Sequence, residues 1–285
     1  MTASAPARTI AFQGHPGAYS DLACRQAYPE LTTLPCETFE DTFAAVREGR
    51  AGLGMIPIEN SLAGRVADIH HLLPESGLHI IAEHFQRVVH NLLAPKGAKL
   101  ADLKTVASHV QALSQCRKTI RTLGLKLVVR ADTAGAAAEI AAAGDKTAAA
   151  IASTLAAEIY GLDILKESME DAEHNTTRFI IMAREPLDPD PAAGSIVTSL
   201  VFRVRSVPAA LYKALGGFAT NGVNITKLES YILDGAFTVA QFYADIEGHP
   251  DQRPVRLALE ELSFFSNEVR ILGVYPASPF RAAPR

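Results

Sequence analysis

The chain has 285 residues, of which 48% are hydrophobic and 20% are charged, and its formal net charge is −4. This length exceeds the usual size of a single domain and allows two domains with sizeable cores. The slightly acidic balance provides no basic field, which argues against nucleic acid as a partner. The 3 cysteines, Cys24, Cys36 and Cys116, lie far apart without C-x-x-C spacing, so neither a disulfide scaffold nor a zinc site is supported.

Residues 1–8 lack the apolar core of a signal peptide, and no stretch of the chain is apolar for long enough to span a bilayer. We therefore expect a cytoplasmic protein without a membrane partner. The histidines, including His90, lack the i, i+4 pairing and the carboxylate context of a zinc helix, so we expect no metal. Gly14 and Gly17 lack the third glycine of a dinucleotide fingerprint, so we expect no nucleotide cofactor.

Short apolar runs alternate with stretches of helical periodicity from Thr9 to about Pro186. The apolar runs predict strands at 10–12, 53–58, 79–81, 92–93, 105–107, 125–129, 148–151 and 179–182. The periodic stretches predict helices at 19–28, 39–48, 112–123, 133–143 and 154–160. This alternation predicts an α/β fold in which right-handed βαβ units build largely parallel sheets.

The pattern changes at residues 186–194, a proline-rich segment without an apolar face that we expect to be a linker. The chain beyond it predicts a strand at 196–205, a helix at 208–220, strands at 227–233 and 237–246, a helix at 255–265 and a strand at 271–275. Asp234 and Gly235 form a residue pair that strongly favours a hairpin turn. This order is the ferredoxin-like β-α-β-β-α-β arrangement, whose sheet edge or open face commonly pairs with a second copy.

Polar clusters follow or precede the apolar runs at several predicted junctions. The most informative is N-T-T-R-F at 175–179, which places an amide, two hydroxyls and a guanidinium directly before a buried run. The others are G-H-P-G-A-Y-S at 14–20, P-I-E-N-S-L-A-G at 57–64, S-H-V-Q-A-L-S-Q-C at 108–116 and D-T-A-G-A-A at 132–137. Each cluster alone could be an ordinary turn or helix cap. Together they favour a site for a small, oxygen-rich anion held by neutral hydrogen bonds and one positive charge.

The strings N-T-T-R-F, P-I-E-N-S-x-x-G and S-H-x-Q-A-L-x-Q-C resemble the prephenate dehydratase family, and the resemblance runs from about Thr9 to Tyr275. It implies a catalytic domain at 8–185 with two lobes like a periplasmic binding protein, joined by hinges near 84–90 and 165–172. It also implies a ferredoxin-like ACT domain at 195–277, the amino-acid-sensing module that family members carry. The expected assembly is a homo-oligomer, a dimer through the ACT domains and possibly a tetramer.

The resemblance implies decarboxylative dehydration of prephenate to phenylpyruvate in L-phenylalanine biosynthesis. Aromatisation drives this elimination, so neither a metal nor a redox cofactor is expected. The enzyme must hydrogen-bond or protonate the departing hydroxyl while it holds two anionic arms in place. It must not clamp the departing carboxylate so tightly that decarboxylation is opposed. Neutral donors such as Thr, Ser, Asn and Gln meet these demands better than lysine.

By the resemblance, Thr177 is the donor aimed at the departing hydroxyl. Thr176 offers the same chemistry, but neighbouring strand residues point to opposite faces, so one of the two should be structural. Arg178 either binds a substrate carboxylate or forms a salt bridge that fixes the start of the strand. We expect the whole set of catalytic residues to be Thr177, Asn60, Ser108, Gln115, Glu59 and Asp132. The expected substrate-binding residues are Thr176, Arg178, Ser61, Tyr19, Ser20 and Phe179.

Several of these residues have an alternative structural role. Asn60 is also a candidate helix N-cap. We expect structural or lobe-closing roles for Glu59 and Asp132, because a carboxylate beside a dianionic substrate would weaken binding. Ser108 and Gln115 open and line a helix whose N-terminus favours anions, and His109 is expected to form local hydrogen bonds. All polar junctions precede the linker, so we expect residues 1–187 alone to retain activity.

The phenylalanine site that the family places between ACT modules is altered in this chain. The family's G-A-L string reads Ala209, Ala210 and Leu211, and the string E-S-R-P reads Glu229, Ser230, Tyr231 and Ile232. The first change adds a methyl group where a ligand approaches the backbone, and the second removes a charge and a rigid turn. The expected allosteric residues are Ala209, Ala210, Leu211, Asn221, Asn224, Leu228, Glu229 and Ser230. We expect phenylalanine to bind there and to inhibit.

Two alternatives to prephenate dehydration remain open from the sequence. Arogenate dehydratase acts on the amino-acid analogue of prephenate and would differ only by an extra acceptor for the ammonium group. A non-catalytic small-molecule sensor coupled to an ACT module would need no donor at a reacting centre, and the cluster at Thr177 argues against it.

Overall fold

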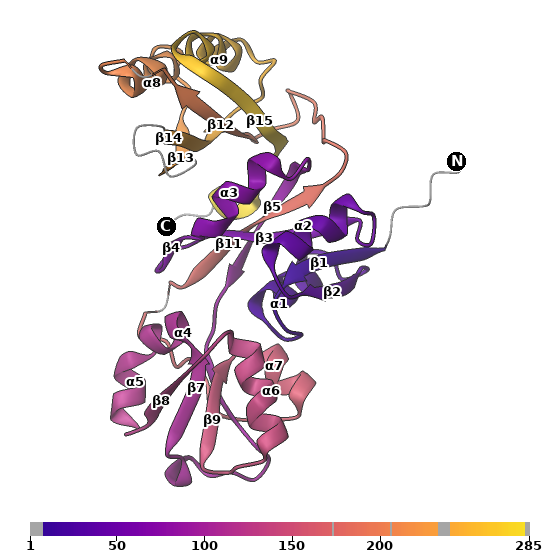
Figure 1. The fold of residues 1–285 in the computed structure, drawn as a ribbon, viewed down its shortest axis with the longest axis vertical. Helices are drawn as coiled ribbons and strands as arrows, with labels where there is room; N and C mark the ends of the chain where they lie inside the picture. The colour runs from indigo at the N-terminus through magenta and orange to yellow at the C-terminus, as the bar shows by residue number, and fades with distance from the viewer. Residues whose placement is uncertain (1–7, 173, 206, 233–239, 283–285) are drawn as a thin grey trace. The chain divides into compact units, whose positions relative to one another are not determined.

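The computed structural model describes residues 8–172, 174–205, 207–232 and 240–282 (Figure 1). The chain forms two compact units, and each unit is built from two stretches that are separated in the sequence. The first unit contains Met1–Val66 and His84–Phe179, and the second contains Ala67–Glu83 and Ile180–Arg285. The strands β5 (His79–Arg87) and β11 (Thr176–Ala183) run from one unit into the other.

The first lobe of the first unit is built on a sheet with the strand order β2-β1-β3-β11-β5. Strand β1 pairs in parallel with β2 and β3, as the predicted βαβ units require. The other elements of this lobe are β1 (Thr9–Gln13), α1 (Tyr19–Ala27), β2 (Thr32–Cys36), α2 (Phe39–Arg47), β3 (Leu53–Asn60) and β4 (Gly64–Arg65). The short strand β4 pairs antiparallel with the end of β3 and forms a hairpin with it.

The second lobe has the strand order β10-β6-β9-β7-β8. Its elements are β6 (Asn91–Ala94), η1 (Leu100–Asp102), β7 (Thr105–His109), α4 (Val110–Gln115), α5 (Arg117–Thr122), β8 (Lys126–Arg130), α6 (Thr133–Ala143), β9 (Ala148–Ala152), α7 (Thr154–Tyr160) and β10 (Asp163–Lys166). Strand β7 is parallel to β8 and β9, whereas β6 is antiparallel to β9 and β10. Val106, Ile151 and Ile120 are buried in its core.

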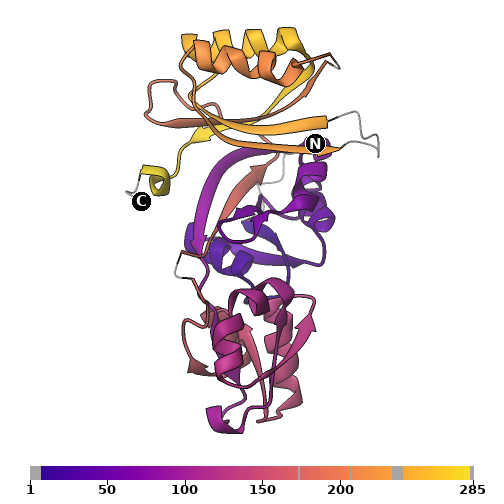
Figure 2. The same ribbon diagram turned by 90° about the vertical axis from the view of Figure 1, so that its left-hand side faces the viewer.

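The second unit contains a four-stranded antiparallel sheet in the order β13-β14-β12-β15. Its elements are α3 (Ala67–Glu75), β12 (Ile196–Val204), α8 (Ala210–Thr220), β13 (Ile225–Ile232), β14 (Ala240–Glu247), α9 (Arg253–Phe265), β15 (Ser266–Pro276) and η2 (Pro279–Ala282). Helices α8 and α9 lie together on one face of this sheet (Figure 2). Phe202, Phe218 and Leu262 belong to the hydrophobic core between these two helices and the sheet.

Residues 67–83 pack against the C-terminal sheet although they lie far from it in the sequence. The rings of His70 and Tyr243 lie 5.3 Å apart, and those of His71 and Tyr231 lie 5.1 Å apart. A Cβ atom on Gly273 would lie 2.0 Å from the carbonyl oxygen of Ile80, so glycine is needed for this close approach. The sequence-based domain limits contain no sign of this association.

Most predicted elements are present. Helices α6 and α7 have the predicted limits, and two α/β lobes precede the β-α-β-β-α-β segment. The single helix predicted at 112–123 is wrong, because Cys116 has φ −108° and ψ 16° and separates α4 from α5. Six elements were not expected from the sequence: the strands β2, β4 and β10, the helix α3 and the short 3₁₀ helices η1 and η2. The predicted hairpin turn at Asp234 and Gly235 lies outside the described residues.

Candidate active site

Asn60 and Thr177 meet where the end of β3 lies beside the beginning of β11. The Nδ2 atom of Asn60 donates to Thr177 Oγ1 over 2.9 Å and to Asn175 Oδ1 over 2.8 Å. Its Oδ1 atom accepts from the backbone N–H groups of Leu62 and Ala63 at 3.0 and 2.9 Å. The predicted helix N-cap role of Asn60 is wrong, because a β3–β4 turn and not a helix follows it.

The hydrogen bonds of Asn60 determine what Thr177 can offer a ligand. An amide has two donor hydrogens and two acceptor lone pairs, and all four of Asn60 are used. Asn60 therefore has no donor left for a substrate. Thr177 Oγ1 accepts from Asn60, so its own hydroxyl hydrogen points elsewhere and is available as a donor.

Ser61 ties the beginning of β11 to the β3–β4 turn. Its hydroxyl donates to the His174 carbonyl over 2.6 Å and accepts from the Thr176 N–H over 3.0 Å. The backbone N–H of Ser61 donates to the Thr176 carbonyl over 2.9 Å. These bonds hold the backbone of Thr176, whereas the bond from Asn60 holds the side chain of Thr177.

A continuous run of side-chain hydrogen bonds leads from Asn175 into the second lobe. The Nδ2 atom of Asn175 donates to Gln115 Oε1 over 2.9 Å. The same oxygen lies 2.8 Å from His90 Nε2, and His90 Nδ1 lies 2.9 Å from the Tyr19 hydroxyl. Asn175 and His90 are almost completely buried. Burial lowers the pKa of His90 and raises the pKa of Tyr19 well above its usual value of 10.0.

The loop before α1 packs against the second lobe. The Ser153 hydroxyl donates to the Gly17 carbonyl over 2.5 Å, and the Tyr160 hydroxyl donates to the Pro16 carbonyl over 2.8 Å. Gly17 has φ +89°, and a Cβ atom there would lie 2.8 Å from Ala156 Cα. The glycine therefore permits both the left-handed backbone and the contact between lobes. Ser20 lies in the first turn of α1.

Asp132 and His15 form a second link between the lobes. Asp132 caps α6 by accepting from the Gly135 N–H over 2.6 Å, and its other oxygen lies 2.6 Å from His15 Nδ1. A Cβ atom on Gly135 would lie 3.1 Å from that same ring nitrogen, so the glycine makes room for the imidazole. Asp132 thus contacts a residue of the other lobe, and its predicted lobe-closing role stays a prediction.

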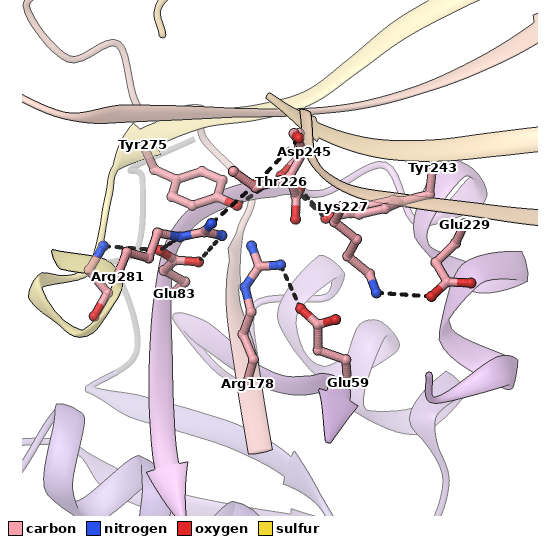
Figure 3. Close-up of polar contacts among 12 residues, drawn as sticks. Glu59, Glu83, Arg178, Thr226, Lys227, Glu229, Tyr243, Asp245, Tyr275 and Arg281 are labelled. Atoms are coloured by element: carbon pink, nitrogen blue, oxygen red, sulfur yellow. Dashed lines mark hydrogen bonds and ion pairs between the residues drawn. The ribbon is translucent and has the colours of Figure 1, made fainter. Parts of the chain in front are cut away.

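Arg178 and Glu59 form an ion pair in the first unit, in which the arginine is buried and the glutamate is partly exposed. The Arg178 Nη1 atom lies 3.0 Å from Glu59 Oε1, and the Arg178 side chain is 3% exposed (Figure 3). This is the geometry of the salt-bridge alternative for Arg178. The next residue, Phe179, is buried in the core.

Ser108 is not brought to this cluster. Its side chain is completely buried, and its hydroxyl donates to the Ile151 carbonyl over 2.6 Å. His109 accepts from the Gln111 N–H and caps α4, as the expected local hydrogen bonding requires. In the described ranges, no three His, Cys, Asp or Glu side chains are placed to hold a metal ion.

The family model for prephenate dehydratase matches residues 10–187. The chain belongs to the prephenate dehydratase family. It is similar to the bifunctional N-acyl-homoserine lactone acylase/prephenate dehydratase of Komagataeibacter europaeus, with 59% identity over 97% of this chain and 99% of that protein. It is 40% identical to arogenate dehydratase/prephenate dehydratase 1 of Arabidopsis thaliana, covering 94% of this chain and 71% of that protein.

The solved structure of prephenate dehydratase from Arthrobacter aurescens in complex with L-Phe is 30% identical to this dehydratase. The structural match covers 94% of this chain and 89% of the Arthrobacter aurescens chain, with a TM-score of 0.85. The two sheet-rich lobes are thus those of a dehydratase, which confirms the predicted enzyme class. No helix within the described parts of the chain is long and apolar enough to cross a membrane.

Three residues in the hydrogen-bonded cluster around Asn60, Thr177 and Gln115 were not among the expected site residues: His90, Asn175 and Glu170. Asn175 stands in the N-T-T-R-F string, so the motif itself was the signal for it. His90 lies in the segment predicted to cross between lobes, and only that position pointed to it. The carboxylate of Glu170 accepts from the His90 N–H over 2.9 Å.

The expected allosteric residues of the dehydratase lie in three places: a pocket, the loop between α8 and β13, and the strand β13. Ala209, Ala210 and Leu211 line an open pocket together with Val204, Arg205, Val207, Pro208 and Tyr212. Asn221 instead bonds to the Gly217 carbonyl and to Glu261, and Asn224 precedes β13. Leu228, Glu229 and Ser230 lie on the edge strand β13, where Glu229 pairs with Lys227 at 3.2 Å (Figure 3).

Proposed function

We propose that this chain converts prephenate to phenylpyruvate with Thr177 as the hydrogen-bond donor to the departing hydroxyl. The observation that carries the proposal is the 2.9 Å bond from Asn60 Nδ2 to Thr177 Oγ1. It occupies an acceptor lone pair of the threonine and leaves the hydroxyl hydrogen for a ligand. Within the described residues, both hydrogens of Asn60 Nδ2 are taken by Thr177 and Asn175, so the neighbouring Thr176 side chain accepts no equivalent bond from Asn60.

The elimination breaks two bonds of the substrate. The bond to the departing carboxylate breaks and releases carbon dioxide, and its electron pair enters the ring. The ring expels the hydroxyl group, which takes up one proton from solvent and leaves as water. Thr177 stabilises the negative charge that develops on this oxygen, and the bond that Thr177 receives from Asn60 strengthens its own donation.

Turnover assays with the purified chain test this proposal. Phenylpyruvate formation from prephenate is expected without added metal, and dialysis against a chelator should leave the rate unchanged. Arogenate is the alternative substrate, because the Arabidopsis relative carries both names. We expect a higher kcat/KM for prephenate, and the reverse order would assign the chain to arogenate.

We also propose that phenylalanine regulates the enzyme through an ACT domain at 195–277, in a cytoplasmic homo-oligomer. The β-α-β-β-α-β order of the second unit supports the ACT domain. The solved relative from Arthrobacter aurescens was obtained in complex with L-Phe. Calorimetry with phenylalanine, with and without a substrate analogue, tests this regulation. Binding should weaken in the presence of the analogue, since allosteric coupling is reciprocal. If calorimetry detects no binding at millimolar phenylalanine, the proposed regulation by phenylalanine is wrong.

A second candidate function is hydrolysis of the amide bond of N-acyl-homoserine lactones. It is favoured by the Komagataeibacter europaeus relative, whose name includes this activity and whose sequence aligns over 99% of its length. His15 is the candidate base, because Asp132 holds Nδ1 at 2.6 Å and leaves Nε2 to take a proton from water. Release of the free amine should then be lost in His15→Ala. No amine release by the unaltered chain rejects this function.

A further inference from the structure

The hydrogen bonds around Asn60 have one direction, which is set by the backbone. The N–H groups of Leu62 and Ala63 can only donate, so the atom of Asn60 that faces them must be the oxygen. Its amide nitrogen then donates to Thr177 Oγ1 and to Asn175 Oδ1. A reversed Asn60 amide would place its NH₂ group against two backbone donors.

The same direction continues through the next two amides. Asn175 accepts at Oδ1, so its nitrogen is the atom that donates to Gln115 Oε1. That oxygen also lies 2.8 Å from His90 Nε2. A carbonyl oxygen only accepts, so His90 Nε2 must carry a hydrogen. The backbone of the β3–β4 turn thus determines the tautomer of a histidine in the segment between the lobes.

The other ring nitrogen can change its protonation without disturbing this run of bonds. The Tyr19 hydroxyl lies 2.9 Å from His90 Nδ1 and 2.8 Å from the Val89 carbonyl. It donates to a neutral ring, and beside a protonated ring it turns its hydrogen to Val89 and accepts. The titratable groups that face His90 are Tyr19, through its hydroxyl, and Glu170, through its carboxylate. Burial favours the neutral ring.

We propose that His90 is a positioning residue for the dehydration. Its Nε2–H group holds Gln115, which holds Asn175, and Asn175 and Asn60 together keep the Thr177 hydroxyl hydrogen turned toward the substrate. The inference rests on the proposed role of Thr177 as donor. Gln115 belongs to α4 of the second lobe, whereas Asn60 and Thr177 belong to the first, so the donor is fully ordered only when the lobes are in contact.

A matched pair of variants separates this role from simple packing. The amide nitrogen of a glutamine reaches about as far as His90 Nε2, so His90→Gln keeps the donor to Gln115. The shorter His90→Asn reaches only the position of Nδ1 and loses that donor. We expect kcat of His90→Asn to fall by on the order of 10-fold or more with KM nearly unchanged, because misplaced groups cost rate rather than binding. His90→Gln should stay close to the unaltered enzyme.

The Thr177→Val background distinguishes failure of this inference from failure of the proposed function. In that background His90→Asn should cost nothing further, since there is no hydroxyl left to orient. If Thr177→Val is inactive but His90→Asn and His90→Gln turn over equally fast, the positioning role is overturned and the donor role stands. Near-normal turnover of Thr177→Val overturns both.

Nitrogen NMR of the full chain labelled at histidine tests the inference even if the His90 variants do not fold. The shifts of the two ring nitrogens distinguish a protonated from an unprotonated atom. Near neutral pH we expect hydrogen on Nε2 and none on Nδ1 of His90. Hydrogen on Nδ1 alone would overturn the inference.

Discussion

Thr177→Val removes one hydroxyl and keeps the β-branched shape of the side chain, so it isolates the donor of the proposed mechanism. Loss of a single preorganised donor typically costs 10²–10³ in turnover, or about 2.7–4 kcal/mol of transition-state stabilisation. The variant also leaves one hydrogen of Asn60 Nδ2 without its partner. That loss should lower the free energy of unfolding by about 1–3 kcal/mol, and less where water reaches the amide.

The assay is phenylpyruvate formation from prephenate, with urea unfolding measured on the same preparations. Thr176→Val is the matched control, because it makes the same change at the neighbouring strand position without breaking the bond from Asn60. We expect this control to turn over within about 3-fold of the unaltered enzyme, a difference of less than 1 kcal/mol in the barrier. A folded Thr177→Val enzyme with near-normal kcat, or a larger loss in Thr176→Val, would refute the assignment of the donor.

Three further changes test other parts of the account. Gly17→Ala should lower the free energy of unfolding by roughly 1–3 kcal/mol, because φ is +89° and a Cβ atom would meet Ala156. The control is Gly144→Ala, where the backbone is also left-handed but a Cβ atom would lie in open space, so the free energy of unfolding should fall less. Arg281→Met should lower the free energy of unfolding by about 3–5 kcal/mol, since it removes the opposite charge that contacts the buried Glu83 carboxylate at 2.6 and 2.9 Å (Figure 3) and leaves the Ser278 N–H on one of its oxygens. An unchanged urea midpoint would contradict this role of the pair. Burial lowers the pKa of His90 in the folded chain below its ordinary value of 6.5, so as the pH falls the unfolded chain takes up the proton first. The free energy of unfolding should therefore fall as the pH drops below about 6.5, and it should fall less steeply in His90→Gln. Identical plots of this free energy against pH for the two proteins would contradict the prediction.

The regular elements were predictable where local signals agree with the tertiary structure. Helix α6 begins after Asp132, which caps it, and ends at Gly144 in the left-handed region with φ +65°. Both residues are readable in the sequence. Helix α5 was not separable from α4, because its first N–H groups are held by Asp171, which lies far along the chain. No local pattern indicates such a contact.

The domain limits show the same distinction. Residues 67–83 look like part of the first α/β lobe in the sequence, yet they pack in one compact unit with the C-terminal sheet. The association depends on Gly273, whose missing side chain admits the Ile80 backbone. Activity of residues 1–187 alone stays a prediction, but such a fragment would expose α3 and the beginning of β5. We therefore expect it to be less stable than the full chain.

The candidate site was predictable as a set of segments and not as a set of bonds. The sequence identified Asn60, Gln115 and Thr177 in separate strings. In the structure Asn60 bonds Thr177 directly, Asn175 joins Asn60 to Gln115, and His90 adds a further bond to Gln115. It places Ser108 elsewhere, with its hydroxyl bonded to the Ile151 carbonyl. Side-chain direction at a junction depends on partners from distant strands, which a single sequence does not contain.

Asn60→Asp tests most directly whether Asn60 directs the Thr177 hydroxyl. The two side chains have the same shape, but a carboxylate only accepts, so Thr177 would have to donate to it instead of to the substrate. We predict that kcat of Asn60→Asp falls to about the level of Thr177→Val, and that the double variant is no slower than either single one. A folded Asn60→Asp enzyme with near-normal kcat, or losses that multiply in the double variant, would contradict the account.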